Sequence, residues 1–158
     1  MAKTRIRVYD MDGTIVCSMH RYKIKDNGKI DLDYWRENEP LAYKDKLLPL
    51  AKQYKEDITR EDTIVIIATA RVLNDPDDCF IRDILGTPNA IISRGPNDTR
   101  SGGELKIKGL QKLFNLKGFK GIKDIVFFED NATYLKTVCD HFKHLGMLGV
   151  YVPSEQGH

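Results

Sequence analysis

The run Thr63-Ile-Val-Ile-Ile-Ala68 is the feature that most restricts how this chain can fold. It is continuous, mostly β-branched and apolar, without the polar alternation of a strand that has one face in water. Runs of this kind are typical of strands buried on both faces, as in parallel sheets covered by helices. We therefore expect helices on both sides of the sheet that contains this strand.

Strand-like and helix-like segments alternate along the rest of the chain. Further strands are expected at 6–10, 89–93, 124–128 and 147–152, and helices at 41–54, 77–85, 103–116 and 131–145. Pro49 should break or delay the first helix, because proline has no amide proton to donate inside a helix. The order predicts an α/β, Rossmann-like fold of three layers around a mostly parallel five-stranded sheet.

Residues 16–40 are expected to form only a small flap on this fold. Two alternating runs flank Asn27-Gly28, a pair that favours a β-hairpin turn. The stretch between Gly13 and Thr63 is too short for a large independent cap domain. With 158 residues, of which 41% are hydrophobic, the chain 1–158 is expected to form a single domain.

The cysteines and the distribution of apolar residues indicate in which compartment the protein is expected. The three cysteines (Cys17, Cys79 and Cys139) are widely spaced and odd in number, which does not suit a disulfide framework. The N-terminus lacks an apolar stretch fit for a signal peptide, and no run approaches about 18 apolar residues. We therefore expect a cytoplasmic protein without a membrane partner. The net charge of +2 is too small to argue for nucleic-acid binding by itself.

Two carboxylates follow the first expected strand, in Asp10-Met-Asp12-Gly13-Thr14. Side chains alternate along a strand, so Asp10 and Asp12 point the same way, and Gly13 permits a sharp exit from the sheet. A carboxylate pair at a strand end can bind a hard divalent cation. It can also supply a nucleophile beside a proton donor.

Other strand ends carry complementary groups. In parallel sheets the carboxyl ends of the strands meet at one edge, where ligands bind. A hydroxyl, cations and a second group of acids at that edge would suit an anionic, metal-bridged substrate, most naturally a phosphate. The groups are Thr69, Ala70 and Arg71 after the strand at 63–68, Glu129, Asp130 and Asn131 after that at 124–128, and Lys106 near a helix start.

This set of residues resembles the haloacid dehalogenase (HAD) superfamily of phosphohydrolases, whose four motifs occur in the same order. Asp10-Met-Asp12-Gly13-Thr14 matches the first motif and Thr69 the second. Lys106 fits the third motif, and Glu129-Asp130 fits the fourth. The similarity spans almost the whole chain. Within the superfamily, the chain is also similar to polynucleotide-phosphatase-like and RNA-repair-associated branches and to small phage-encoded proteins.

The resemblance implies a role for each matched residue. Asp10 would attack phosphorus to form an aspartyl-phosphate, and Asp12 would act as general acid and then general base. The Asp10 carboxylate, the Asp12 backbone carbonyl and the Asp130 carboxylate would hold Mg²⁺. Thr69, the Ala70 amide and Lys106 would bind the phosphoryl oxygens.

Several assignments stay open at this stage. Lys108 competes with Lys106 as the third-motif cation, and Glu129 competes with Asp130 as metal ligand or serves behind it. Arg71 could clamp a substrate phosphate or form a surface ion pair with a nearby aspartate (Asp75, Asp77 or Asp78). Arg94, on the same expected edge, could contact a second phosphate or have no role.

The substrate also stays open. A small or absent cap generally leaves an open site that admits large substrates, which favours a phosphatase acting on nucleic-acid ends. A 5′(3′)-nucleotidase acting on free mononucleotides would share every catalytic residue. A phospho-accepting receiver domain has Asp, Thr and Lys at strand ends too, but its acidic pair and phosphorylated Asp occur in a different order.

Overall fold

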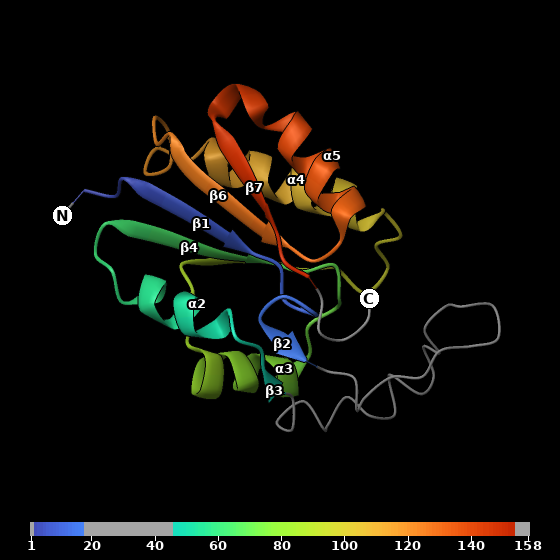
Figure 1. Ribbon diagram of the computed structural model, residues 1–158. Coiled ribbons are helices and arrows are strands. Elements are labelled where there is room, and N and C mark those ends of the chain that lie inside the picture. The colour runs from blue at the N-terminus through green and yellow to red at the C-terminus, as the bar shows by residue number, and fades with distance from the viewer. Residues whose placement is uncertain (1, 18–45, 154–158) are drawn as a thin grey trace.

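The computed structural model describes residues 2–17 and 46–153, and a five-stranded sheet forms the centre of this part (Figure 1). The strand order is β5-β4-β1-β6-β7, and every neighbouring pair is parallel. The expected α/β fold with a five-stranded sheet is therefore confirmed. The strands are β1 (Arg5–Tyr9), β4 (Thr63–Ala68), β5 (Ala90–Ile92), β6 (Asp124–Glu129) and β7 (Met147–Tyr151).

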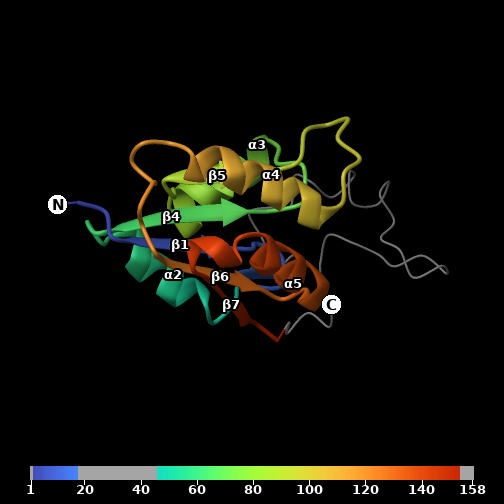
Figure 2. The same ribbon diagram turned by 90° about the horizontal axis from the view of Figure 1, so that it is seen from above.

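Helices cover both faces of this sheet, as the two views show (Figures 1 and 2). One face carries α2 (Ala51–Ile58), α3 (Asp75–Phe80) and the π-helical turn η3 (Ile81–Leu85). The other face carries α4 (Gly102–Phe114), α5 (Ala132–His141) and the 3₁₀ turn η4 (Lys143–Leu145). Three layers result, in agreement with the expectation from sequence.

Strand β4 explains why the sheet needs both helix layers. All six of its residues are buried. Ile64 and Ile66 join the apolar core under α4 and α5, whereas Val65 and Ile67 join the core under α2 and α3. A continuous apolar run therefore supplies two hydrophobic cores at once, which is the physical reason for its lack of alternation.

Two segments differ from the sequence expectation. Helix α2 begins only at Ala51, two residues after Pro49, and continues to Ile58, beyond the expected end at residue 54. The expected helix at 77–85 divides into α3 and η3, and it ends at Gly86 with φ of 102°. That backbone angle favours glycine, so Gly86 closes the segment as expected.

The flap lies almost wholly outside the described residues, including its Asn27-Gly28 turn. Only its first two residues are described. They form β2 (Val16–Cys17), which pairs in antiparallel fashion with β3 (Lys46–Leu47), beyond the expected flap. Across residues 2–17 and 46–153, no helix combines the length and apolar character needed to cross a membrane.

Candidate active site

Asp10 lies at the centre of the carboxyl edge of the sheet, because β1 is the middle strand. Its backbone amide donates to the Phe128 carbonyl at 3.0 Å, which fixes the start of the loop against β6. Gly13, with φ of 82°, then turns the chain so that Thr14 faces back toward Asp10. The first motif thus places a buried carboxylate beside the end of β6.

Lys106 reaches Asp10 from α4. Its Nζ donates to Asp10 Oδ1 at 2.8 Å and to Glu129 Oε1 at 2.6 Å, and its side chain is only 1% exposed. The start of α4 lies close against α5, because a Cβ on Gly102 would lie 2.7 Å from the Tyr134 ring. The structure therefore brings Lys106 to the acidic residues, whereas Lys108 is exposed.

The three charges set one another's ionisation. Burial raises the pKa of Asp10, but the Lys106 ammonium and the hydrogen bonds around the carboxylate outweigh burial and lower it overall. Burial lowers the pKa of Lys106, but Asp10 and Glu129 outweigh it, and the net shift is upward. Burial and the Asp10 carboxylate raise the pKa of Glu129. Asp10 is thus held as an anion and Lys106 as a cation.

The acidic residues Asp10, Glu129 and Asp130 form a buried cluster with the chemistry of a cation site. Each offers a carboxylate oxygen, and these oxygens all lie within 4.8 Å of one another. Both Glu129 oxygens already accept from protein donors, Oε1 from Lys106 and Oε2 from the amides of Asp130 (3.0 Å) and Asn131 (3.3 Å). Both Asp10 oxygens accept as well, from Lys106 and Thr14, and the all-oxygen donor set of the three acids fits Mg²⁺.

Thr14 belongs to the first motif, but it was not among the site residues predicted from the sequence. Its hydroxyl lies 2.9 Å from Asp10 Oδ2 and 3.4 Å from Asp130 Oδ1, and the residue is 1% exposed. It therefore links the acids that follow β1 and β6. Its position two residues after Asp12, directly behind a turn-forming glycine, was the signal available in the sequence.

Arg71 forms an ion pair with Asp77, one of the aspartates expected from the sequence, and it also contacts Asp12. Its terminal nitrogens contact Asp12 Oδ1 at 2.8 Å and Asp77 Oδ1 at 2.7 Å. The Arg71 side chain is 8% exposed and that of Asp77 2%, so the ion pair between them is buried rather than superficial. Arg71 therefore connects the second acid of the first motif to the start of α3.

The loops after β4 and β5 are joined through Arg94. Thr69, which is buried, donates its amide to the Ile92 carbonyl at 2.8 Å. The Arg94 guanidinium donates to the carbonyls of Ala70 (2.6 Å), Asp98 (2.8 Å) and Arg100 (2.6 Å). Arg94 therefore holds the loop after β5 next to Thr69 and Ala70.

Asn131, the last in chain order of the residues predicted at the site, caps helix α5. Its side-chain oxygen accepts from the Tyr134 amide at 3.0 Å, which satisfies one of the free donors at the start of α5. Its own amide donates to Glu129. Asn131 thus fixes the point at which the chain leaves β6, next to Asp130.

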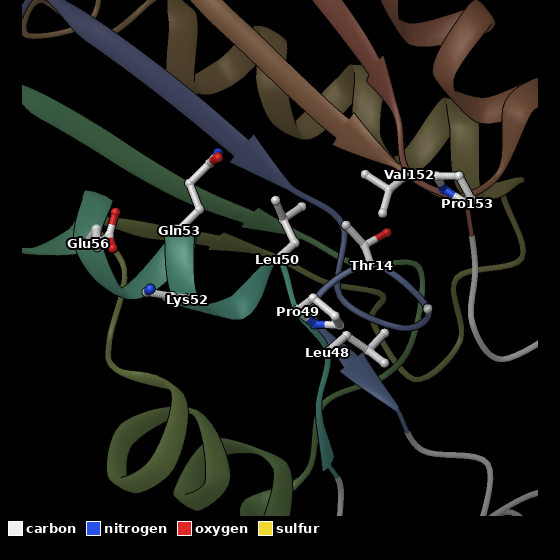
Figure 3. A pocket seen from close by; sticks show the side chains of 10 residues that line it. Thr14, Leu48, Pro49, Leu50, Lys52, Gln53, Glu56, Val152 and Pro153 are labelled. Atoms are coloured by element: carbon white, nitrogen blue, oxygen red, sulfur yellow. The ribbon is translucent and has the colours of Figure 1, made fainter.

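A cavity of about 670 Å³ adjoins the site on the side of α2 (Figure 3). Thr14 is shared between the two, because it lines this cavity while its hydroxyl contacts Asp10 and Asp130. The cavity has a mixed apolar and polar lining. Its other residues are Gly13, Leu48, Pro49, Leu50, Lys52, Gln53, Glu56, Val152 and Pro153.

Solved structures with a similar fold include known HAD proteins. A haloacid dehalogenase-like hydrolase from Streptococcus pneumoniae has a TM-score of 0.63 at 12% identity, covering 93% of this chain and 83% of that one. A chain of the Pnkp1/Rnl/Hen1 RNA repair complex has a TM-score of 0.58 at 21% identity, covering 95% of this chain and 42% of that one. At these identities the similarity establishes the fold alone, and this fold is the one expected from the resemblance to the HAD superfamily.

Sequence comparison gives a closer relationship. The 5′-deoxynucleotidase of Escherichia phage T5 is 31% identical over 84 residues, which make up 50% of this chain. The aligned part spans about a third (34%) of that phage protein. The model of the bacteriophage T5 5′-deoxynucleotidase family matches residues 1–100. Those residues carry Asp10, Asp12, Thr69 and Arg71, whereas Lys106 and Asp130 lie beyond them. The chain therefore belongs to the bacteriophage T5 5′-deoxynucleotidase family and has the haloacid dehalogenase fold.

Proposed function

We propose that this chain is a Mg²⁺-dependent phosphomonoester hydrolase that works through an aspartyl-phosphate at Asp10. The observation that carries the proposal is the contact between Asp10 and Lys106 at 2.8 Å in a buried site. A carboxylate is repelled by an anionic phosphoryl group unless nearby cations offset the repulsion. Lys106 supplies one such cation, and it also holds Asp10 in its ionised, nucleophilic form.

In the first step an Asp10 oxygen forms a bond to phosphorus, and the bond between phosphorus and the ester oxygen breaks. The Asp12 carboxyl group donates its proton to the departing oxygen. In the second step the Asp12 carboxylate takes a proton from water, whose oxygen attacks phosphorus. The bond from phosphorus to Asp10 then breaks, so inorganic phosphate leaves and both aspartates return to their starting state.

The Asp10 and Asp130 carboxylates would hold Mg²⁺, together with the Asp12 backbone carbonyl. The bound ion would supply positive charge to the phosphoryl oxygens. Thr69, the Ala70 amide and Lys106 would hold the remaining oxygens of that group. Thr14 would keep Asp10 and Asp130 at a fixed separation through the contacts of its hydroxyl.

The family relationship favours a nucleoside 5′-monophosphate as substrate, because the phage T5 relative is a 5′-deoxynucleotidase. A phosphorylated nucleic-acid end is the second candidate. It is favoured by the short stretch between the first and second motifs, which leaves no room for a large cap. The two substrates require the same chemistry at Asp10 and differ only in what surrounds the leaving oxygen.

The reaction is tested by measuring phosphate release from an aryl phosphate with Mg²⁺ and with EDTA. We expect turnover by the wild type with Mg²⁺, and none after chelation or in Asp10→Asn. Asp10→Asn keeps the size of the side chain and removes its nucleophilic charge. Equal turnover by the wild type and Asp10→Asn would refute the mechanism.

The substrate is tested with a panel of deoxynucleoside 5′-monophosphates, 3′-monophosphates and oligonucleotides phosphorylated at either end. We expect the highest kcat/KM with the free 5′-monophosphates. A clear preference for oligonucleotide ends would instead support the nucleic-acid substrate. Asp10→Asn assayed on the same panel controls for contaminating phosphatases.

A further inference from the structure

A chain of charges runs from the second acid of the first motif, which is partly exposed, to buried residues at the start of a helix. Asp12 contacts Arg71 at 2.8 Å, and Arg71 contacts Asp77 at 2.7 Å. Asp77 is fixed in turn by the capping box of α3, since its amide donates to Asn74 Oδ1 at 3.2 Å. Its Oδ2 accepts from the Asn74 amide, also at 3.2 Å. The Asp12 carboxylate is therefore tied to a rigid helix start.

Asp12 depends on this chain more than Asp10 would. Its side chain is 26% exposed, whereas that of Asp10 is 9% exposed. A partly exposed carboxylate on a loop can rotate about two side-chain bonds, and a proton donor displaced by an ångström loses much of its effect. The largely buried Arg71 side chain can hold the Asp12 carboxylate in one orientation.

We propose that Arg71 is a positioning residue for Asp12 rather than a ligand of the substrate phosphate. This inference rests on the proposed function, because it concerns the proton that Asp12 transfers. The Arg71 side chain sits between two carboxylates with one terminal nitrogen on each. To clamp a phosphate, it would have to weaken a largely buried contact with Asp77 or release Asp12.

The proposal has a kinetic consequence that a phosphate clamp would not have. The alkoxide of a nucleoside is a strong base and a poor leaving group, so it needs a proton as its bond to phosphorus breaks. A nitrophenolate is a weak base and can leave without one. Misplacing Asp12 should therefore slow alkyl phosphates strongly and aryl phosphates weakly, whereas loss of a phosphate ligand should slow both alike.

The experiment compares kcat/KM for a deoxynucleoside 5′-monophosphate and for p-nitrophenyl phosphate in Arg71→Met and Asp77→Asn. The ratio kcat/KM covers the steps up to phosphoenzyme formation, so hydrolysis of the intermediate does not enter. We expect Arg71→Met to lose about 100-fold on the nucleotide, the lower part of the range for general acid catalysis. On the aryl ester we expect a loss of only a few-fold. Asp77→Asn should also lose more kcat/KM on the nucleotide than on the aryl ester, but both losses should be smaller than in Arg71→Met.

Two further variants isolate the route through Asp12. If Arg71 acts only through Asp12, Arg71→Met should add less than about twofold to the loss caused by Asp12→Asn, because effects of residues acting as a unit are not additive. Arg82→Met is the matched control, since Arg82 forms an exposed pair with its neighbour Asp83. It should leave both substrates unchanged.

Equal losses on both substrates, or full additivity with Asp12→Asn, would overturn the role of Arg71 while leaving the phosphatase intact. An inactive wild type would overturn the proposed function itself, so the two failures are distinguishable. If Arg71→Met does not fold, as judged by circular dichroism, Asp77→Asn carries the test. Its side chain is nearly the same size and retains an oxygen able to accept from the Asn74 amide.

Discussion

Asp10 and Asp12 belong to one short motif but lie in opposite surroundings. Asp10 is buried, and its oxygens contact Lys106 and Thr14. Asp12 is more exposed and contacts Arg71, which is anchored on the other side of the site by Asp77. The comparison shows that two identical side chains, two positions apart, have different partners, and the proposed division of chemistry between them rests on this difference.

The partners come from different parts of the chain. Apart from Thr14 of the same motif, the groups around Asp10 are supplied by α4 and the end of β6, whereas Arg71, which contacts Asp12, is supplied by the segment that follows β4. The α4 and β6 side collects the cluster of acids and the buried lysine, which suits nucleophilic attack and cation binding. The β4 side presents a carboxylate oriented by an arginine, which suits proton transfer.

The largest expected effect separates the two aspartates directly. Asp10→Asn should lower kcat by on the order of 10⁴-fold or more, because no phosphoenzyme can form without the nucleophile. Asp12→Asn should still become phosphorylated by p-nitrophenyl phosphate but hydrolyse the intermediate slowly, since the base that activates water is lost. Acid quench followed by intact-mass measurement should detect added phosphoryl mass in Asp12→Asn alone. Phosphorylation of Asp10→Asn would break the assignment.

The next largest effect concerns the cation beside Asp10. Lys106→Met should lower kcat by about 10²- to 10³-fold, the range for removal of one group that stabilises developing charge. It should also lower the free energy of unfolding by about 3 kcal/mol, because it leaves the Asp10 and Glu129 carboxylates buried without their cation. Steady-state kinetics and urea unfolding measure the two effects.

Lys108→Met is the control for Lys106→Met. Lys108 lies two residues further along α4 and is exposed, so the variant should match the wild type in both measurements. A loss of activity in Lys108→Met equal to that in Lys106→Met would contradict the geometry of the site.

The smallest expected effect belongs to Thr14, which touches both Asp10 and Asp130. Thr14→Val keeps the shape of the side chain and removes the hydroxyl, so one hydrogen bond worth about 1 kcal/mol is lost, or roughly a factor of five in kcat/KM. The concentration of Mg²⁺ needed for half-maximal activity should rise. Thr14→Ser retains the hydroxyl and should stay near wild type, and equal losses in both variants would assign Thr14 a packing role.

Much of the fold could be predicted because its signals are local. The limits of β4 follow from its apolar run, and Gly86 marks a helix end where a positive φ is required. The start of α2 was predicted less well. Proline is accepted in or before the first turn of a helix but excluded from the interior, so Pro49 marks a boundary without fixing its position.

The sequence by itself determined that two carboxylates stand at the end of a strand in a parallel sheet. This follows from the apolar run that precedes them and from the order of strands and helices, which can be read along the chain. The strand ends at Tyr9, so strand alternation does not set the directions of Asp10 and Asp12. Tertiary structure decided the partners, because those contacts join residues far apart in the chain. Lys106 and Asp10 are separated by 96 positions, and Arg71 and Asp12 by 59. The motif position favours Lys106 over Lys108 without showing what either side chain contacts, and no local pattern predicts which carboxylates Lys106 and Arg71 would reach. Only the packing of α4 and α3 against the sheet edge selects which charge is buried beside each aspartate.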